Sequence, residues 1–241
     1  FIQQVMVFLY RRGLKSSQSI IFQNSDDKKL FNKLKITSSS QSSHIVNGSG
    51  VDLDLYPFSP VPNKPIFLML SRLLVDKGVR EYVEAARIVK TQFPKAIFQL
   101  AGRLDSNPSS INSKELKFWI NEGFIKYLGE ISSVQKIISS CKIYVLPSYR
   151  EGMPRSVLEA MAIGRPILTT DTPGCRETVI NGKNGLLVPP KNSKSLANAM
   201  IQFLNTKEDT IQKMGKESYN LAKDKYAVEK INKNMFNIMR L

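Results

Sequence analysis

The feature of this sequence that most limits its fold is a regular alternation of short apolar runs and longer amphipathic segments after Pro65. The apolar runs have the length of buried strands and lie at 66–71, 96–101, 124–128, 142–147, 166–169 and 185–188. The segments between them have helical spacing and lie at 78–91, 112–122, 133–140, 155–163 and 175–180. Strands that alternate with helices are joined by crossovers, which build a parallel sheet covered on both faces. We therefore predict an α/β fold with a doubly wound parallel Rossmann-like sheet over residues 65–210.

The rest of the chain indicates a smaller unit, a linker and terminal helices. The first part contains, in order, a helix over 2–14, a strand from Ser19 to Gln23, a capped helix over 26–34 and a serine-rich surface loop from Thr37 to Ser43. Residues 50–65 hold four prolines, which favour an extended interdomain linker, and a long helical stretch starts at Ser193. We divide the chain into a small unit at 1–46, a linker at 47–64, the sheet domain at 65–210 and C-terminal helices at 211–241 that pack back toward the small unit.

Composition excludes several kinds of site. Cys141 and Cys175 are too few for a disulfide framework or a cysteine metal site, and we expect both to pack as small apolar groups. A single histidine rules out a multi-histidine metal site. The net charge of +15 raises nucleic acid, anionic membranes and phosphorylated ligands as partners. Because the basic residues are spread along the chain without interleaved aromatic residues, we expect an anionic membrane surface and diphosphates as partners, and no nucleic acid.

The amino-terminal sequence fits neither a membrane span nor a secretory signal. The longest apolar stretch, Val5 to Tyr10, is far shorter than the about 20 residues that a membrane-spanning helix needs. Arg11 and Arg12 follow it without a small-residue cleavage site. Since residue 1 is Phe, we expect the sequence to start inside a longer chain or after a removed segment.

The candidate site lies in the loops that follow the strands, because ligands of doubly wound sheets bind beyond the carboxyl ends of the strands. The most informative loop precedes the helix at 155–163, where Pro154 suits the first helical turn. There the N–H groups of Arg155 and Ser156 have no helical partner and point outward with the positive end of the helix dipole. This pattern predicts a diphosphate site at the start of the helix.

Two glutamates flank this predicted site, Glu151 in the loop and Glu159 eight residues further along in the helix. Carboxylates beside a bound anion are unfavourable unless each has a specific task. The segment 148–166 resembles the E-x7-E signature of glycosyltransferase family 4, the retaining GT-B enzymes. The resemblance covers nearly the whole chain, and its further matches lie at 47–52, 71–72, 76–78, 101–102, 128–129, 171–177 and 181–190.

The resemblance implies a role for each residue of the site. Arg72 and Lys77 hold the donor diphosphate, and Glu151 approaches the transferred sugar, so these three form the catalytic set. Glu159 accepts hydrogen bonds from both ribose hydroxyls. The other donor-binding residues are Gly152 and Met153 with N–H groups for the sugar, Arg155 and Ser156 at the helix start, and Gly102, Arg103, Leu128 and Gly129 around the base. Pro154 stands where family members often carry a glycine, which removes one donor N–H.

The implied function is transfer of a hexose or N-acetylhexosamine from a UDP-sugar to a glycan acceptor, polyprenyl-diphosphate-linked, with retention of configuration. No metal or other cofactor is expected, since the Asp52-Leu53-Asp54 motif falls in the linker and fits a turn. The resemblance places the protein in the cytoplasm, peripheral at the inner face of the bacterial cytoplasmic membrane. It also implies that residues 1–46 match only the last part of an acceptor-binding domain, so we expect this chain to bind the donor and to lack transfer activity alone.

Three alternatives stay open at this point. A UDP-sugar epimerase or a phosphorylase shares the architecture but catalyses a different reaction. A dinucleotide-dependent dehydrogenase is disfavoured, because residues 71–78 after the first strand lack the G-x-G-x-x-G pattern. The third alternative is a non-catalytic basic protein that binds membranes or nucleic acid.

Overall fold

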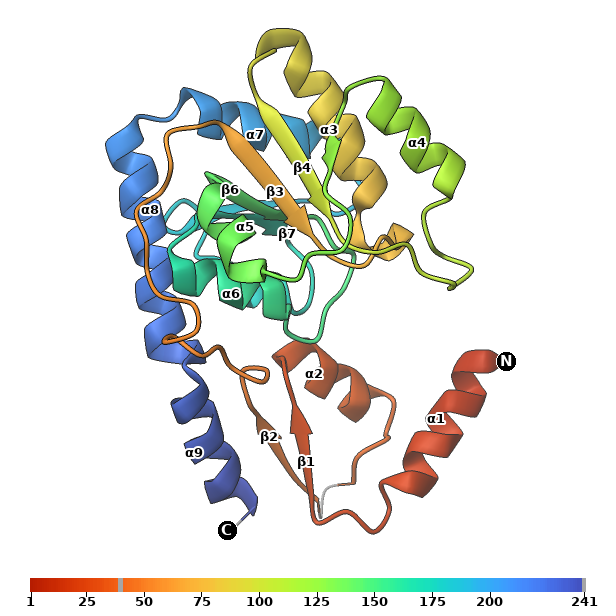
Figure 1. The fold of residues 1–241 in the computed structure, drawn as a ribbon. Coiled ribbons are helices and arrows are strands. Elements are labelled where there is room, and N and C mark those ends of the chain that lie inside the picture. The colour runs from red at the N-terminus through yellow and green to blue at the C-terminus, as the bar shows by residue number, and fades with distance from the viewer. Residues whose placement is uncertain (39–40, 240–241) are drawn as a thin grey trace.

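The computed structural model describes residues 1–38 and 41–239, with a large sheet domain above a smaller unit (Figure 1). The sheet of the large domain has six strands, all parallel, in the order β5-β4-β3-β6-β7-β8. They are β3 (Ile66–Leu70), β4 (Ile97–Ala101), β5 (Lys126–Tyr127), β6 (Ile143–Leu146), β7 (Ile167–Thr170) and β8 (Gly185–Val188). The predicted doubly wound parallel sheet is confirmed, and each apolar run contains one strand.

Helices cover both faces of this sheet. They are α3 (Val79–Gln92), α4 (Ser113–Asn121), α5 (Val134–Ser140), α6 (Arg155–Ile163), α7 (Ser193–Asn205) and α8 (Glu208–Leu221). Figure 1 shows α3, α4 and α7 on one face and α5, α6 and α8 on the other. Helix α3 packs on α7, and α6 packs on both α5 and α8. The loop that enters α6 therefore starts from the middle of the sheet, after β6.

The structure corrects the expected helix at 175–180, which is a single 3-10 turn, η2 (Arg176–Thr178). The side chain of Asn184 accepts a hydrogen bond from the Ile180 N–H at 2.7 Å and donates one to the Thr178 carbonyl at 3.0 Å. Because a buried side chain satisfies these backbone groups, the segment needs no helical hydrogen bonds.

Two further expectations about secondary structure were wrong in detail. The serine-rich loop at 37–43 gives way to β2 (Ser42–Ile45), because parallel pairing with β1 (Ser19–Phe22) outweighs its polar composition; residues 39–40 lie outside the described residues. The helical stretch from Ser193 is broken into α7, α8, a π-helical turn at Ala222–Tyr226 and α9 (Val228–Met239). Extended backbone at Thr206 ends α7.

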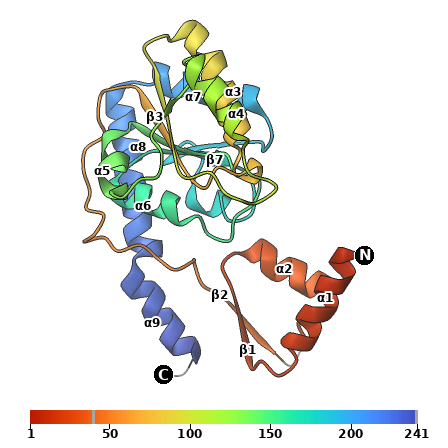
Figure 2. The same cartoon turned by 45° about the vertical axis from the view of Figure 1, so that its right-hand side comes forward.

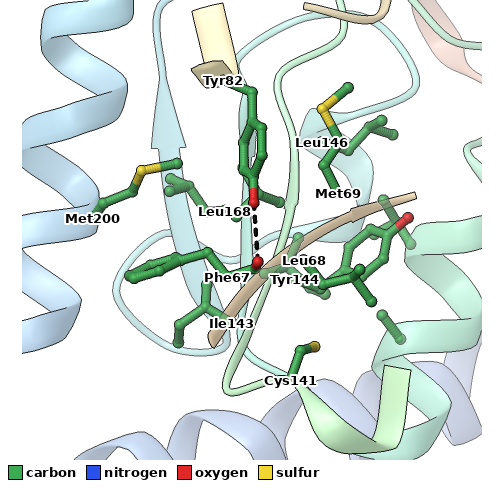
Figure 3. Packing of buried hydrophobic residues seen from close by; sticks show 14 of the residues in the cluster. Phe67, Leu68, Met69, Tyr82, Cys141, Ile143, Tyr144, Leu146, Leu168 and Met200 are labelled. Carbon is green, nitrogen blue, oxygen red and sulfur yellow. Dashed lines mark hydrogen bonds between the residues drawn. The ribbon is translucent and has the colours of Figure 1, made fainter. Parts of the chain in front are cut away.

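The core lies between the sheet and its helices (Figure 3). Phe67 and Phe98 stack across β3 and β4 with ring centroids 5.2 Å apart. The buried Tyr82 hydroxyl of α3 donates to the carbonyls of Phe67 and Gln99, which fixes α3 on these two strands. Cys141 is buried in this core, as expected, and burial raises the pKa of its thiol to about 12.

The small unit is a β-α-β crossover preceded by a helix (Figure 2). Strands β1 and β2 are parallel, α2 (Ser25–Lys33) connects them, and α1 (Ile2–Gly13) precedes them. The Asn24 side chain caps α2 by accepting a hydrogen bond from the Asp27 N–H at 2.8 Å. Figures 1 and 2 both show the amino-terminal end of α2 turned toward the sheet domain.

The linker has no regular helix or strand but packs firmly on the sheet domain. Arg165, which follows α6, is fully buried and donates to the carbonyls of Ser59, Pro60, Cys141 and Ile163. At the start of the linker, Val51 forms a bridge with Ala227, just before α9. The linker thus packs against both α6 and the C-terminal helices.

Candidate functional site

The centre of the candidate site is the point where the chain reverses its direction across the sheet. Strands β3, β4 and β5 extend to one side and β6, β7 and β8 to the other, so the switch point, where ligands of such sheets bind, lies at the carboxyl ends of β3 and β6. Here Lys77 Nζ lies 2.7 Å from Glu151 Oε1, and each side chain is only 15% exposed. The Tyr149 N–H donates to the Asp76 carbonyl at 2.8 Å, which holds the two loops together. The structure thus unites two predicted catalytic residues from different loops.

Helix α6 begins beside this pair with its amide end uncapped by any side chain. Pro154 is the N-cap, with φ −75° and ψ 104°, and Arg155 is the first helical residue. The Tyr144 hydroxyl of β6 donates to the Leu70 carbonyl at the end of β3 at 3.0 Å, and the Ser156 side chain of α6 lies beside this phenol. These contacts place the helix start over the ends of β3 and β6, where its N–H groups and dipole favour an anion.

Glu159 lies about one helical turn after Arg155 in α6 and is 7% exposed. Its Oε1 accepts hydrogen bonds from the Tyr56 hydroxyl at 3.0 Å and from Arg155 Nε at 3.1 Å. Burial raises the pKa of Glu159, whereas these two bonds lower it. Burial and the adjacent carboxylate raise the pKa of Tyr56 to about 12. Both protein donors use Oε1, so within the described ranges Oε2 has no protein donor and can accept one from a ligand.

Arg72 does not join Lys77 at the glutamates. Its Nη1 lies 3.3 Å from Asp105 Oδ2, in the loop after β4, and its side chain is 56% exposed. The β3–α3 loop therefore carries two cations with different partners. Lys77 contacts Glu151 in the loop after β6, and Arg72 contacts Asp105 in the loop after β4. Asp105 was missed in the sequence, because a single aspartate in a polar loop gives no pattern.

The predicted base-binding residues lie together where β3, β4 and β5 end. The Gly102 N–H donates to the Gly129 carbonyl at 2.8 Å, and the Tyr127 hydroxyl donates to the Gly102 carbonyl at 2.7 Å. Leu128 is partly buried against the core between them. Arg103 lies next to Gly102, and its carbonyl accepts the Leu73 N–H at 3.2 Å. Gly102 and Gly129 both have positive φ, of 137° and 72°.

Replacing Gly102 with alanine should destabilise the protein far more than the same change at Gly123. A Cβ at Gly102 would come 1.8 Å from the Ser71 carbonyl oxygen, at a φ that side chains rarely adopt. Gly123 has a φ of 69° but nothing within 4 Å of such a Cβ, so only the cost of the left-handed backbone, about 1 kcal/mol, applies there. Urea unfolding should show a loss of at least about 3 kcal/mol for G102A. Equal losses in both variants would contradict the observed close approach.

The remaining predicted donor-binding residues, Gly152 and Met153, face the small unit and the linker. The Gly152 carbonyl accepts a hydrogen bond from Asn24 Nδ2 at 2.9 Å. Met153 lies so close to Gly48 that a Cβ there would come within 2.6 Å of its Cγ. Asn24 and Tyr56 were both missed in the sequence, because each reaches the site only through contacts across more than a hundred residues.

The Asp52-Leu53-Asp54 motif forms a turn in the linker. Asp52 Oδ1 accepts hydrogen bonds from the N–H groups of Asp54 and Leu55 at 2.9 and 3.1 Å. This side chain is therefore occupied in shaping the backbone. Among residues 1–38 and 41–239, no helix is long and apolar enough to cross a membrane.

The fold is that of a doubly wound α/β protein of the GT-B type, and the predicted site residues Lys77 and Glu151 meet at the switch point of its sheet. The family model for glycosyl transferases group 1 matches residues 57–221. The chain belongs to this family, which confirms the resemblance of the E-x7-E segment.

The relatives are bacterial glycosyltransferases. The chain is 34% identical over 212 residues to N,N'-diacetylbacillosaminyl-diphospho-undecaprenol alpha-1,3-N-acetylgalactosaminyltransferase of Campylobacter jejuni, covering 81% of this chain and 54% of that protein. It is 25% identical to UDP-Gal:alpha-D-GlcNAc-diphosphoundecaprenol alpha-1,3-galactosyltransferase of Escherichia coli, covering 80% and 53%. The crystal structure of Anabaena Alr3699/HepE in complex with UDP matches the fold with a TM-score of 0.83 at 22% identity, covering 98% of this chain and 66% of that one.

These comparisons decide among the alternatives for the class of protein. The relatives are named as transferases, which favours a glycosyltransferase over an epimerase, a phosphorylase or a non-catalytic binding protein. The chain spans about half the length of the curated relatives it matches, 54% and 53%.

Proposed function

We propose that this chain binds the donor in an enzyme that transfers a hexose or N-acetylhexosamine from a UDP-sugar to a polyprenyl-diphosphate-linked glycan, with retention of configuration. The observation that carries the proposal is the Lys77–Glu151 pair, held at the switch point beside the uncapped start of α6. The relatives support the substrate classes, since two of them are named for undecaprenyl-diphosphate acceptors and one of these for a UDP-sugar.

The site suits departure of a nucleoside diphosphate. In the reaction, the bond between the anomeric carbon and the diphosphate oxygen breaks, and UDP leaves with the electron pair. The acceptor hydroxyl forms the new bond from the same face and passes its proton to the departing diphosphate. Lys77, Arg72 and the N–H groups of Arg155 and Ser156 stabilise the negative charge that develops on the leaving group. No step requires a metal ion.

The two glutamates bind different parts of the donor. Glu151 pairs with Lys77 at 2.7 Å, and in the proposed complex it turns to the sugar hydroxyls while Lys77 binds the diphosphate. The N–H groups of Gly152 and Met153 assist at the sugar. Glu159 offers Oε2 to the ribose, and Gly102, Arg103, Leu128 and Gly129 surround the base.

The acceptor side is assigned to the small unit. We propose that residues 1–46 belong to an acceptor-binding domain, that residues 47–64 join it to the donor domain and that residues 211–241 pack back toward it. The net charge of +15 supports a peripheral position at the inner face of the bacterial cytoplasmic membrane, where polyprenyl-linked acceptors lie.

Calorimetry with this chain tests the donor site. We expect UDP, UDP-GlcNAc and UDP-GalNAc to bind at one site, with CDP as the comparison for base selection. Competition of UDP with each UDP-sugar would show that they share the site. Failure of all three uridine ligands to bind would contradict the proposed function.

Glu159→Gln should weaken UDP binding by about 10- to 100-fold, because a carboxylate accepts ribose hydroxyls more strongly than an amide oxygen. The sharper measurement compares UDP with 2'-deoxy-UDP. The wild-type chain should prefer UDP, and E159Q should lose most of that preference. Glu130→Gln, an exposed carboxylate in the loop after β5, serves as the control and should keep it. An unchanged preference in E159Q would show that the ribose binds elsewhere.

A further inference from the structure

The amino-terminal end of α2 contacts the sugar-binding loop on both sides of Glu151. Asn24 Nδ2 donates to the Gly152 carbonyl at 2.9 Å, and Arg150 forms an ion pair with Asp27. Asn24 Nδ2 also donates to Asp27 Oδ2 at 2.9 Å, so the two α2 residues are joined to each other. We call this set of bonds, made by Asn24 and Asp27, the α2 clamp. It holds the residues immediately before and after a predicted catalytic glutamate.

The α2 clamp is shielded and reinforced by its neighbours. Asn24 is only 1% exposed, although it is a polar residue at a helix start. Next to it, Asp26 pairs with Arg176 at 3.0 Å, and Arg176 is itself held by Asp171 at 2.7 Å. Oppositely charged groups therefore line both sides of this contact, with acids on α2 and arginines on the sheet domain. Figures 1 and 2 show the same end of α2 below the loop that enters α6.

The loop has little freedom apart from this contact. The Glu151 N–H donates to the Pro173 carbonyl at 3.0 Å, and the Glu151 side chain meets Lys77. A Cβ at Gly152 would come within 2.4 Å of Gln23 Oε1, so the loop backbone packs against the residue before Asn24. The Gly152 carbonyl shares its peptide unit with the Met153 N–H, so the orientation of this proposed sugar donor is set partly from the small unit.

We propose that Asn24 and Asp27 are positioning residues for the transferred sugar, and that α2 thereby determines how strongly the sugar adds to the binding of UDP. This inference rests on the proposed function, because it assigns the loop at 151–153 to the sugar of a UDP-sugar. The diphosphate and ribose contacts come from Lys77, α6 and Glu159, which the α2 clamp does not touch directly. Loosening the clamp should therefore weaken the contacts with the sugar and leave the affinity for UDP unchanged.

Asn24→Ser separates the role in the clamp from the role in helix capping. Serine is as good an N-cap as asparagine, but its short side chain cannot also reach the Gly152 carbonyl. The measurement is the ratio of the affinities for UDP-GlcNAc and UDP-GalNAc to that for UDP, by calorimetry on this chain. We expect N24S to keep the UDP affinity and to lower the ratio by about two- to tenfold for the preferred sugar, as loss of one hydrogen bond predicts.

Asn192→Ser is the matched control. Asn192 caps α7 through the Ser195 N–H at 2.9 Å, as Asn24 caps α2, but among the described residues it bonds no residue of the loop at 150–152, so N192S should leave both the affinities and their ratio unchanged. A second measurement is a cycle of Asp27→Ala, Arg150→Ala and the double variant. The two changes should lower the ratio non-additively, whereas the exposed Glu84–Arg87 pair of α3 should give no effect on it.

The outcomes separate the two proposals. The α2 clamp is overturned if N24S keeps the wild-type ratio of UDP-sugar to UDP affinity and if the Asp27–Arg150 cycle shows additive effects or none. UDP binding would in that case still support the donor site. Equal binding of UDP and both UDP-sugars by the wild-type chain also overturns the α2 clamp, since the loop then adds no sugar contact. Absence of any uridine-ligand binding overturns the proposed function and this inference together.

Discussion

Lys77→Ala should lower the rate of sugar transfer by about 10²–10³-fold, the usual cost of removing one group that stabilises developing charge. Lys77 meets Glu151 beside the start of α6, where the leaving group is expected, and its side chain is 15% exposed, so little solvent screens it. The loss should appear in kcat as well as in kcat/KM, because the charge on the diphosphate grows as the bond breaks. The measurement is the initial rate of UDP release by the whole protein with a polyprenyl-diphosphate-linked acceptor.

Lys142→Ala is the matched control for this prediction. Lys142 is 14% exposed and lies 2.5 Å from Glu208, so it resembles Lys77 in burial and in having a carboxylate partner, but it lies at the amino end of β6, at the other edge of the sheet from the switch point. K142A should keep the transfer rate within about twofold, whatever its cost in stability. A comparable rate loss in both variants would show that K77A acts through stability. A normal rate in K77A would remove Lys77 from the catalytic set.

Arg165→Met should lower the free energy of unfolding by about 3–5 kcal/mol, which makes it the largest stability effect that we expect from a single charged residue. The guanidinium is fully buried, and burial lowers its pKa. It donates to carbonyls at 59, 60, 141 and 163, and methionine would leave several of these without a donor. Since these carbonyls belong to the linker, α6 and the end of α5, all three should loosen together.

Thermal unfolding measures this effect directly. For a chain of this size, the expected loss corresponds to a decrease in Tm on the order of 10 °C. Arg87→Met is the control, because Arg87 is 51% exposed, pairs with Glu84 on the surface of α3 and should leave the Tm essentially at the wild-type value. A decrease of less than about 1 kcal/mol for R165M would mean that other donors satisfy the linker carbonyls.

The sheet domain could be predicted from the sequence because its signals are local and repeated. Each apolar run carries its own strand, and the periodic segments between them carry α3, α4, α5 and α6. The errors lie where a single side-chain contact or the pairing of separated strands determines the backbone conformation. Asn184 replaces helical hydrogen bonds after Thr178, and pairing with β1 converts part of the serine-rich segment into β2. Neither contact leaves a periodic pattern in the residues concerned.

The site could be predicted only as far as its motif extends. Glu151, Glu159 and the start of α6 follow from one segment, and the contact of Glu151 with Lys77 follows from two loops meeting at the sheet edge. Tyr56 and Asn24 could not be predicted, because a tyrosine in a proline-rich linker and an asparagine at a helix cap have common local explanations. The pairing of Arg72 with Asp105 was missed for the same reason.

In the proposed complex, UDP binds across the switch point, with its diphosphate at the start of α6. A crystal structure of this chain with UDP would locate the nucleotide. We expect diphosphate oxygens on Lys77 and on the N–H groups of Arg155 and Ser156, with the ribose on Glu159. Well-defined UDP elsewhere, such as in the groove between α3 and α4 lined by Arg80, Glu84 and Phe118, with the α6 start vacant, would contradict it.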